Sequence, residues 1–178
     1  MIQDKIIAVA KSYIGKTEKP NNSGFNDAEF EKRMVDTGWS KGLSWCSYFC
    51  ELVWREAYKG YGVLDEVIKN FDGSATATYK KFDLDPTWEV TDVPTVGSLA
   101  VWRYGNGWQG HIAIVVEVPT IKLPFNPKSV IAFKTVEGNT NDKGGREGYI
   151  VAAKTRKTGQ PYSAKGLNLI GFIKPKQI

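Results

Sequence analysis

The hydrophobic pattern of this 178-residue chain changes its period near the middle, and this change constrains the fold more than any other feature. In the first half, Ile2, Ile6, Ala10 and Tyr13 recur at helical spacing before Gly15, which is typical of a helix and its end. Further helices are expected, on the same grounds, within residues 27–38, from Trp45 to about Tyr58, within 63–71 and within 75–82.

The second half consists of runs rich in β-branched and aromatic residues, separated by Gly, Pro or Asn. Strands are expected within residues 97–104, 111–118, 129–138, 148–156 and 167–174. Helices followed by strands predict an α+β domain, with N-terminal helices packed on an antiparallel β-sheet of about five to six strands. Because no internal repeat, low-complexity segment or linker interrupts this pattern, residues 1–178 are predicted to form a single domain.

The composition is that of a folded globular protein, because hydrophobic residues make up 42% of the chain. No run reaches the ~18 apolar residues of a membrane span, so we expect no membrane insertion. The first residues, MIQDKIIAVAKSYIG, lack the apolar stretch and cleavage site of a secretory signal. We therefore expect synthesis in the cytoplasm without a signal peptide, and any action outside the cell would follow release or dedicated secretion.

The net charge of +5 is unevenly distributed along the chain. Residues 150–178 contain no Asp or Glu, and their basic residues are Lys154, Arg156, Lys157, Lys165, Lys174 and Lys176. Such an end could meet a polyanion, namely nucleic acid, phospholipid or an anionic cell wall, or its lysines could simply protect strand edges. Because the chain has no RNP pattern, zinc finger or Gly-rich phosphate loop, we expect no nucleic-acid partner.

Cys46 and Cys50 are the only cysteines, and they lie in the segment SWCSYFCELVWREA, which is expected to be helical. A disulfide is disfavoured, because side chains one helical turn apart project in parallel and the compartment of synthesis is reducing. A zinc site would need His111, the only histidine, with a further ligand, and this arrangement matches no common zinc spacing. We therefore expect no metal, which leaves packing and nucleophilic roles for the two thiols.

The two cysteines differ in their expected places on the helix. Cys50 is expected in the middle of the helix among apolar neighbours, where a thiol packs as a small hydrophobic group. Cys46 follows the segment SKGLSW, whose serines and glycine offer an N-cap. A cysteine in the first turn lies near unsatisfied N–H groups and the positive end of the helix dipole, which favour a thiolate. Cys46 is therefore the candidate nucleophile, with ordinary packing as the alternative.

His111 begins a strongly apolar run and is the natural partner for a nucleophilic cysteine. Suppose that residues 111–118 and 130–137 pair as antiparallel strands joined by the Pro-rich loop 119–129. If their ends are aligned, His111 lies directly opposite Glu137 on the same face of the sheet. The carboxylate would then fix the imidazole tautomer and support its positive form. Without such a partner, a single histidine at a strand edge is usually a surface or packing residue.

Three segments together resemble the CHAP domains, papain-like amidases and peptidases of peptidoglycan that are related to the NlpC/P60 group. WCSYFCELVWREA is similar to the Trp-Cys opening of a helix in that family. PTVGSLAVWRYGNGWQGHIAIVVEV resembles its P-x-x-G-D strand followed by a G-H strand, with Ser98 in place of the usual Asp at a structural turn position. TVEGNTND followed by REGYIVAAKTR is similar to its Glu-Gly-Asn strand end. Order and spacing agree over about residues 30–173.

The resemblance implies a papain-like α+β fold and a role for four residues. Cys46 would be the nucleophile, His111 the base, Glu137 the group that orients His111, and Asn139 a further polar member of the site. Glu137 and Asn139 would share one strand face if the strand continues past Gly138. The implied reaction is attack of the thiolate on an amide carbonyl, followed by hydrolysis of an acyl-enzyme, with no cofactor. The backbone N–H of Cys46 is the expected oxyanion donor.

The implied function is that of a peptidoglycan hydrolase, either an N-acetylmuramoyl-L-alanine amidase or a stem or cross-bridge endopeptidase, in a phage lysin or an antibacterial effector. Peptidoglycan or a muropeptide would be the substrate, an immunity or inhibitor protein is a candidate partner, and we expect a monomer. Trp39, Trp45, Trp102 and Trp108 could line a groove for a glycopeptide, or could simply pack. The alternatives are a non-catalytic cell-wall binding module on the same fold and a papain-like hydrolase of a non-wall amide.

Overall fold

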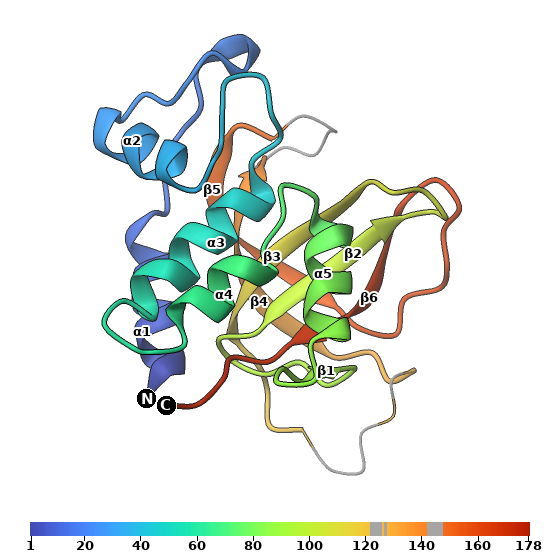
Figure 1. Ribbon diagram of the computed structural model, residues 1–178. Helices are drawn as coiled ribbons and strands as arrows, with labels where there is room; N and C mark the ends of the chain where they lie inside the picture. Colours follow the sequence, from blue (N-terminus) through green and yellow to red (C-terminus); the bar gives the residue numbers. More distant parts are fainter. Residues whose placement is uncertain (122–125, 127, 142–147) are drawn as a thin grey trace.

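The computed structural model describes residues 1–121, 126, 128–141 and 148–178, and its helices cover one face of an antiparallel sheet (Figure 1). The helices are α1 (Ile2–Ser12), the 3₁₀ helix η1 (Pro20–Asn22), α2 (Ala28–Asp36), α3 (Cys46–Ala57), α4 (Leu64–Asn70) and α5 (Ala75–Leu84). Each α-helix agrees closely with a range expected from the sequence. In the described part of the chain, no helix has the length and apolar character needed to cross a lipid bilayer.

The sheet has six strands in the order β1-β6-β2-β3-β4-β5. The strands are β1 (Val90–Thr91), β2 (Leu99–Tyr104), β3 (Gly110–Glu117), β4 (Ala132–Thr140), β5 (Ile150–Lys157) and β6 (Leu167–Ile173). All five expected strands are present, whereas β1 was not expected, because a pair of residues is too short to show a period. The prediction of an α+β fold with helices on an antiparallel sheet is confirmed.

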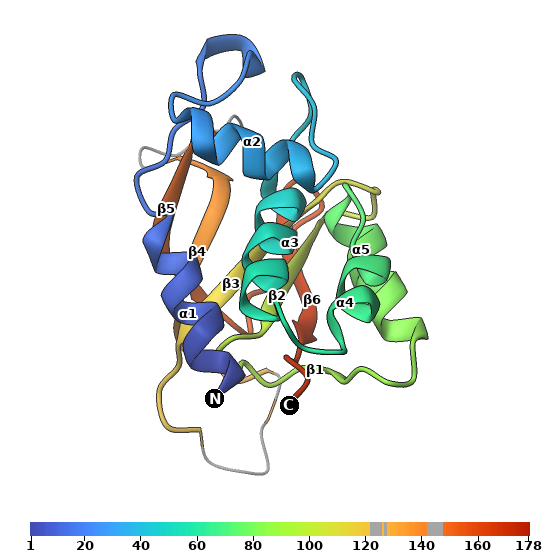
Figure 2. The same ribbon diagram turned by 60° about the vertical axis from the view of Figure 1, so that its left-hand side comes forward.

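Helix α3 lies at the centre of the helical layer, in contact with α1, α2 and α4 and with the strands β3 and β4 (Figures 1 and 2). Because neighbours surround it, buried residues occupy most of its circumference, and Phe49, Cys50, Val53 and Trp54 have no exposed surface. The first turn of α3 therefore has a fixed position relative to the ends of the two strands that it contacts.

Gly138 of β4 permits an unusually close approach of α3 to the sheet. A Cβ atom at this position would lie 2.6 Å from Cβ of Phe49 and 2.7 Å from Cζ3 of Trp45. Trp45 is fully buried, and Phe25 packs on it edge to face with ring centroids 5.0 Å apart. The start of α3 thus packs closely against β4, with the Phe25 ring in contact with Trp45.

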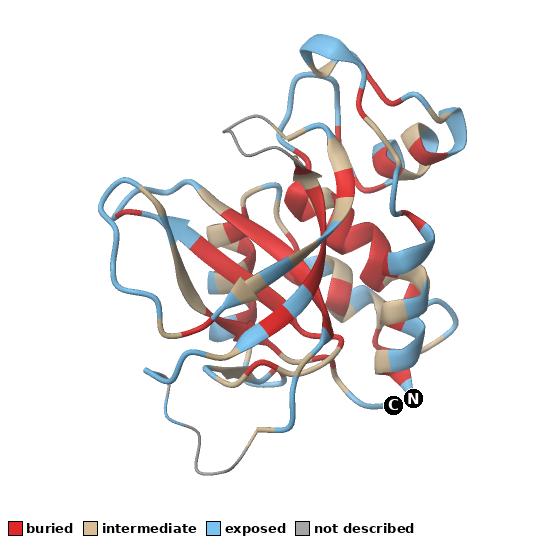
Figure 3. Ribbon diagram, turned by 180° about the vertical axis from the view of Figure 1, so that it is seen from behind, coloured by how far each residue is buried: buried red, intermediate tan, exposed pale blue. Residues whose placement is uncertain are grey.

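The sheet also has an apolar cluster on the face away from the helices. Figure 3 shows the ribbon from that side, with buried residues in red. Its buried members are Ala100, Trp102, Ala113, Val115, Phe133 and Phe172. Side chains alternate between the two faces along a strand, so Ile112 and Ile114 pack in the helical core while Ala113 and Val115 pack in the rear cluster. By this alternation, His111 belongs to the same face as Ala113.

Candidate active site

Cys46 is the first residue of α3, and its side chain is 6% exposed. The preceding residue, Trp45, is the N-cap, and no side chain caps the helix there, so the N-cap expected from the segment SKGLSW is wrong. Trp45 is held through its buried indole instead, whose Nε1–H donates a hydrogen bond to the Glu18 carboxylate at 2.9 Å. The first N–H groups of a helix have no acceptor within the helix, so unsatisfied backbone donors are present in the turn that carries the Cys46 thiol.

Cys50 lies one turn further along α3, with no exposed surface. Burial raises the pKa of its thiol well above the ordinary value, and electrostatic interactions with Cys46 and Glu137 act in the same direction. Both cysteines are free thiols. Among the described residues, no group of three or more His, Cys, Asp or Glu side chains is placed to hold a metal ion. The structure thus puts Cys50 in the packing environment that the sequence predicted.

His111 is the second residue of β3, lies opposite Trp102 of β2 and is 9% exposed. Its ring packs on the Trp102 ring with centroids 5.9 Å apart. The Nε2–H group donates to Oε2 of Glu137 at 2.8 Å, which leaves Nδ1 as the ring nitrogen available to Cys46, whose interaction with the ring raises the pKa of His111. The structure therefore brings Cys46, His111 and Glu137 together in one chain of contacts.

The register between β3 and β4 differs from the one assumed from the sequence. Ile114 is paired with Val136, and continuing this register puts Glu137 opposite Ala113. The expectation that His111 lies directly opposite Glu137 is therefore wrong by two residues. A shift of two keeps every side chain on its face, so His111 and Glu137 still meet as diagonal neighbours. The pairing also shifts near the end of β3, which alignment of the strand ends could not anticipate.

Glu137 is fully buried and accepts hydrogen bonds on both carboxylate oxygens. Thr135 Oγ1 donates to Oε1 at 2.6 Å, and Arg156 donates from Nε to Oε1 at 2.8 Å and from Nη2 to Oε2 at 2.6 Å. Burial alone would raise the pKa of Glu137, but hydrogen bonds and charge interactions with Arg156 and His111 outweigh it and hold the pKa far below its usual range. The carboxylate is therefore ionised at neutral pH.

The protonation of His111 reflects the same balance of forces. Burial lowers the pKa of His111, but hydrogen bonds and charge interactions with Cys46 and Glu137 outweigh burial and raise the pKa to about 9. At neutral pH the ring is therefore a cation next to a thiol at a helix N-terminus. This is the environment in which proteins activate cysteine as a nucleophile.

Asn139 lies near this chain of contacts but has different partners. With its amide oriented by the hydrogen-bond network, Oδ1 accepts from the backbone N–H of Trp45 at 3.2 Å and Nδ2 donates to the Gly148 carbonyl at 2.9 Å. Its backbone is left-handed, with φ of 53°, and the β4–β5 register shifts between Glu137 and Thr140. Asn139 thus contacts the start of α3, and its expected catalytic role stays a prediction.

Arg156 and Thr135 contact the site, although the sequence did not identify them. Thr135 precedes Glu137 by one strand repeat, so its place on the same face could have been read from the period. The strand period does not predict the contact of Arg156 with Glu137, because the strand partner of Arg156 is Phe133 and not Glu137. Only the direction of its long side chain brings the guanidinium to the carboxylate.

The four tryptophans proposed for a substrate groove have different environments. Trp39, Trp45 and Trp102 are 2%, 0% and 5% exposed, so they pack in the interior. Trp108 is 73% exposed, in the turn between β2 and β3 that precedes His111. Of the four, Trp108 is thus the one with a large surface for a ligand.

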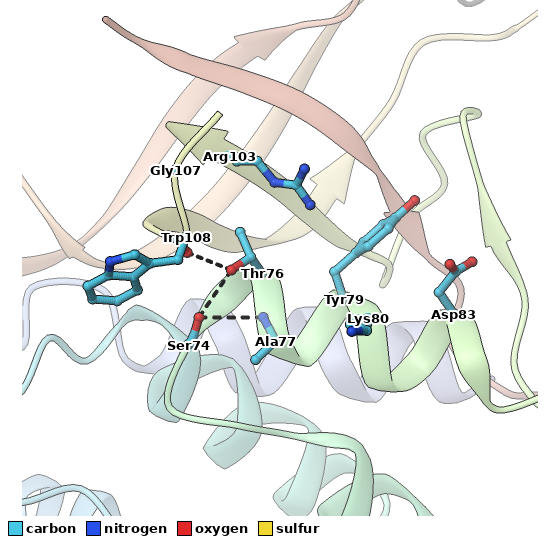
Figure 4. Close-up of a pocket in the computed structure, with 9 residues that line it drawn as sticks. All are labelled: Ser74, Thr76, Ala77, Tyr79, Lys80, Asp83, Arg103, Gly107 and Trp108. Atoms are coloured by element: carbon cyan, nitrogen blue, oxygen red, sulfur yellow. Dashed lines mark hydrogen bonds between the residues drawn. The ribbon is translucent and has the colours of Figure 1, made fainter. Parts of the chain in front are cut away.

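Trp108 borders a cavity of about 370 Å³ between α5 and the end of β2 (Figure 4). Thr76 of α5 donates a hydrogen bond to the Trp108 carbonyl at 2.6 Å, which ties the turn to the helix. Arg103 and Tyr79 also line this cavity. A Cβ atom on Gly110 would lie 2.9 Å from Cγ2 of Thr76, so the cavity wall adjoins the residue before His111.

Comparison with protein families finds that residues 38–124 match the model of the CHAP domain, a segment that includes Cys46 and His111 and ends before Glu137. Comparison with curated proteins and with solved structures found no match. CHAP domains are generally hydrolytic and cysteine-peptidase-like, which suggests peptidoglycan hydrolase or amidase/peptidase activity. The helices on a six-stranded antiparallel sheet are consistent with an α+β, papain-like fold of this kind.

Proposed function

Because residues 38–124 match the CHAP domain family, we propose that this protein is a cysteine hydrolase that cleaves an amide bond of peptidoglycan. The observation that carries the proposal is the buried chain of contacts from Cys46 through His111 to Glu137. Cys46 is the nucleophile, His111 the general base and acid, and Glu137 the group that orients the imidazole. This division of roles is the one by which a nucleophile, a base and a carboxylate hydrolyse acyl bonds.

In the first step, Sγ of Cys46 attacks the carbonyl carbon of the amide, and the thiol proton resides on His111. The tetrahedral oxyanion accepts a hydrogen bond from the backbone N–H of Cys46, which has no acceptor within the helix. His111 then donates its proton to the leaving nitrogen, the C–N bond breaks, and a thioester links the substrate to Cys46. Glu137 stays ionised throughout and stabilises the imidazolium.

In the second step, neutral His111 removes a proton from a water molecule, which attacks the thioester carbonyl. The C–S bond breaks, the carboxylic acid product leaves, and the proton taken from water stays on His111, so the imidazolium and the sulfur anion of the first step are restored. The ring nitrogen that faces the sulfur carries out both proton transfers. Meanwhile Nε2 remains bonded to Glu137, at the 2.8 Å distance found in the resting site.

The substrate bond is either the N-acetylmuramoyl-L-alanine amide or a peptide bond in the stem or cross-bridge. Peptidoglycan as substrate is supported by the family match and by Trp108, whose exposed ring in the turn before β3 offers a surface for a sugar or peptide. A phage lysin or an antibacterial effector, reaching the wall by release or dedicated secretion, is the setting that we propose.

Digestion of purified sacculi tests this function. We expect the wild-type protein to release soluble fragments, and mass spectrometry of their new termini identifies the bond that was cut. Binding to sacculi without release of fragments would instead indicate a wall-binding module. A protein that neither binds nor digests sacculi but hydrolyses other amides would be a hydrolase with a non-wall substrate.

A further inference from the structure

Arg156 forms a bidentate ion pair with the Glu137 carboxylate at the centre of the site. Its Nε and Nη2 groups donate to Oε1 and Oε2 of Glu137 at 2.8 and 2.6 Å. The guanidinium also lies over the Trp102 ring, 5.3 Å from its centroid. The Arg156 side chain is 31% exposed while that of Glu137 is fully buried, so the arginine covers the carboxylate from the solvent side.

Arg156 and His111 bind the same oxygen atom. Oε2 of Glu137 accepts from Nη2 of Arg156 at 2.6 Å and from Nε2 of His111 at 2.8 Å. Two cations therefore share one anion, and each weakens the hold of the carboxylate on the other. Because guanidinium is always charged, Glu137 keeps a positive partner in every protonation state of His111.

The charged and titratable groups around this cluster come from several elements. Cys46 and Cys50 face it from α3, His111 from β3, Glu137 from β4 and Arg156 from β5. Trp102 of β2 contributes no titratable group. Arg156 is thus a permanent positive charge in a cluster whose other members act as acids or bases.

We propose that Arg156 is a positioning residue of the active site, which clamps Glu137 in the orientation that His111 requires and offsets its charge so that the imidazole can release its proton. The fixed orientation of Glu137 depends on the two N–H groups of the guanidinium, which bind both carboxylate oxygens. The effect on the proton affinity of His111 depends only on the positive charge of Arg156. The inference rests on the proposed function where it concerns turnover. Its effect on the titration of His111 is independent of any substrate.

Two substitutions separate the effect of the paired hydrogen bonds of Arg156 from the effect of its positive charge. Arg156→Lys keeps a positive charge but provides a single ammonium, which cannot make the paired contact. We expect it to leave the titration midpoint of His111 within about 0.3 units of the wild type. It should also lower kcat by about tenfold with little change in KM, because the carboxylate loses its fixed orientation.

Arg156→Gln removes the charge and should move the titration midpoint of His111 upward by about one unit, a tenfold gain in proton affinity. Lys157→Gln is the matched control, because it removes the same charge from the next, exposed residue of β5. We expect no shift in that variant. A contribution of Arg156 to stability alone would likewise leave the midpoint of a folded variant unchanged.

NMR titration of the imidazole measures this midpoint without ambiguity, because His111 is the only histidine in the chain. A midpoint in Arg156→Gln that is unchanged or lower than in the wild type would overturn the proposal, as would wild-type kcat in Arg156→Lys. If Arg156→Gln does not fold, the Arg156→Lys variant still decides through its kcat and titration. A protein that shows the expected shift but leaves sacculi intact would refute the proposed function and not the charge effect of Arg156.

Discussion

At the scale of single residues, the proposed mechanism depends on Glu137, which hydrogen-bonds His111 and favours its positive charge. A buried carboxylate without partners would be neutral or would destabilise the fold. Here Thr135, His111 and Arg156 occupy both of its oxygens, so it remains ionised with no exposed surface. Changes at Glu137 should therefore affect catalysis and proton binding together.

Replacement of Glu137 by Gln keeps the side-chain shape but removes the charge. We expect kcat on peptidoglycan fragments to fall by roughly two to four orders of magnitude, the scale of a misplaced base. Glu117→Gln is the control, because Glu117 is an exposed residue at the end of β3 that pairs with Lys134. If a correctly folded Glu137→Gln protein retains nearly full kcat, Glu137 does not orient the base.

The stability of the protein should depend on pH through His111. Its pKa of about 9 in the folded state exceeds the unfolded value of about 6.5, so protonation stabilises the fold. This contribution is complete below pH ~6.5 and is lost as the pH rises through about 9, by on the order of 3 kcal/mol. Glu137 has the opposite sign, and its contribution is lost only in acid, as the pH falls through its depressed pKa.

Urea unfolding between pH 6 and 10 measures this dependence in the wild type and in His111→Gln. The difference between the two free energies of unfolding should shrink as the pH rises through ~9, because other groups titrate alike in both proteins. Curves that stay parallel over this range would show that His111 gains no extra proton affinity on folding.

At the scale of elements, the site depends on how closely the start of α3 approaches β4. Gly138→Ala would put a Cβ atom 2.6 Å from Phe49, so we expect a loss of about 1–3 kcal/mol in the free energy of unfolding and a fall in kcat as Cys46 moves. Gly62→Ala is the control, with nothing within 4 Å of the added atom. Thermal unfolding of the two variants gives the comparison, and equal, unchanged stabilities would refute the close approach.

Asn139 offers a second test of the same junction. Asn139→Gly removes the side chain that accepts from Trp45 N–H but tolerates the left-handed backbone, whereas Asn139→Ala adds strain of about 1 kcal/mol. We expect both variants to lower kcat by about tenfold to a hundredfold, because the first turn of α3 loosens. Neither should move the His111 titration. A shift in Asn139→Gly as large as in Glu137→Gln would mean that Asn139 acts on the histidine.

The sequence predicted the helices and strands well, because their apolar residues follow the helical and strand periods closely. It also predicted the contact of His111 with Glu137 from a register that was wrong, since a shift of two residues preserves the face. Arg156 could not be predicted in the same way. Its strand partner is Phe133, and the contact with Glu137 depends on a side-chain direction that no period encodes.

At the scale of the whole molecule, three of the six basic residues in the C-terminal part pair with acidic residues from elsewhere in the fold. Lys174 pairs with Glu89 at 2.7 Å, Lys176 with Glu66 at 2.8 Å, and Arg156 with Glu137. The uneven charge along the sequence thus becomes a set of ion pairs between distant segments. These contacts account for half of the basic residues in this part of the chain.

The central claim is that the first of the two cysteines is the nucleophile of a peptidoglycan hydrolase. The most direct measurement is the release of soluble fragments from purified sacculi by the wild type, Cys46→Ala and Cys50→Ser. We predict that Cys46→Ala releases none, whereas Cys50→Ser keeps most of the activity and unfolds at a lower temperature, because Cys50 is a core residue. Fragment release by a folded Cys46→Ala protein, or an inactive but fully stable Cys50→Ser protein, would contradict the account.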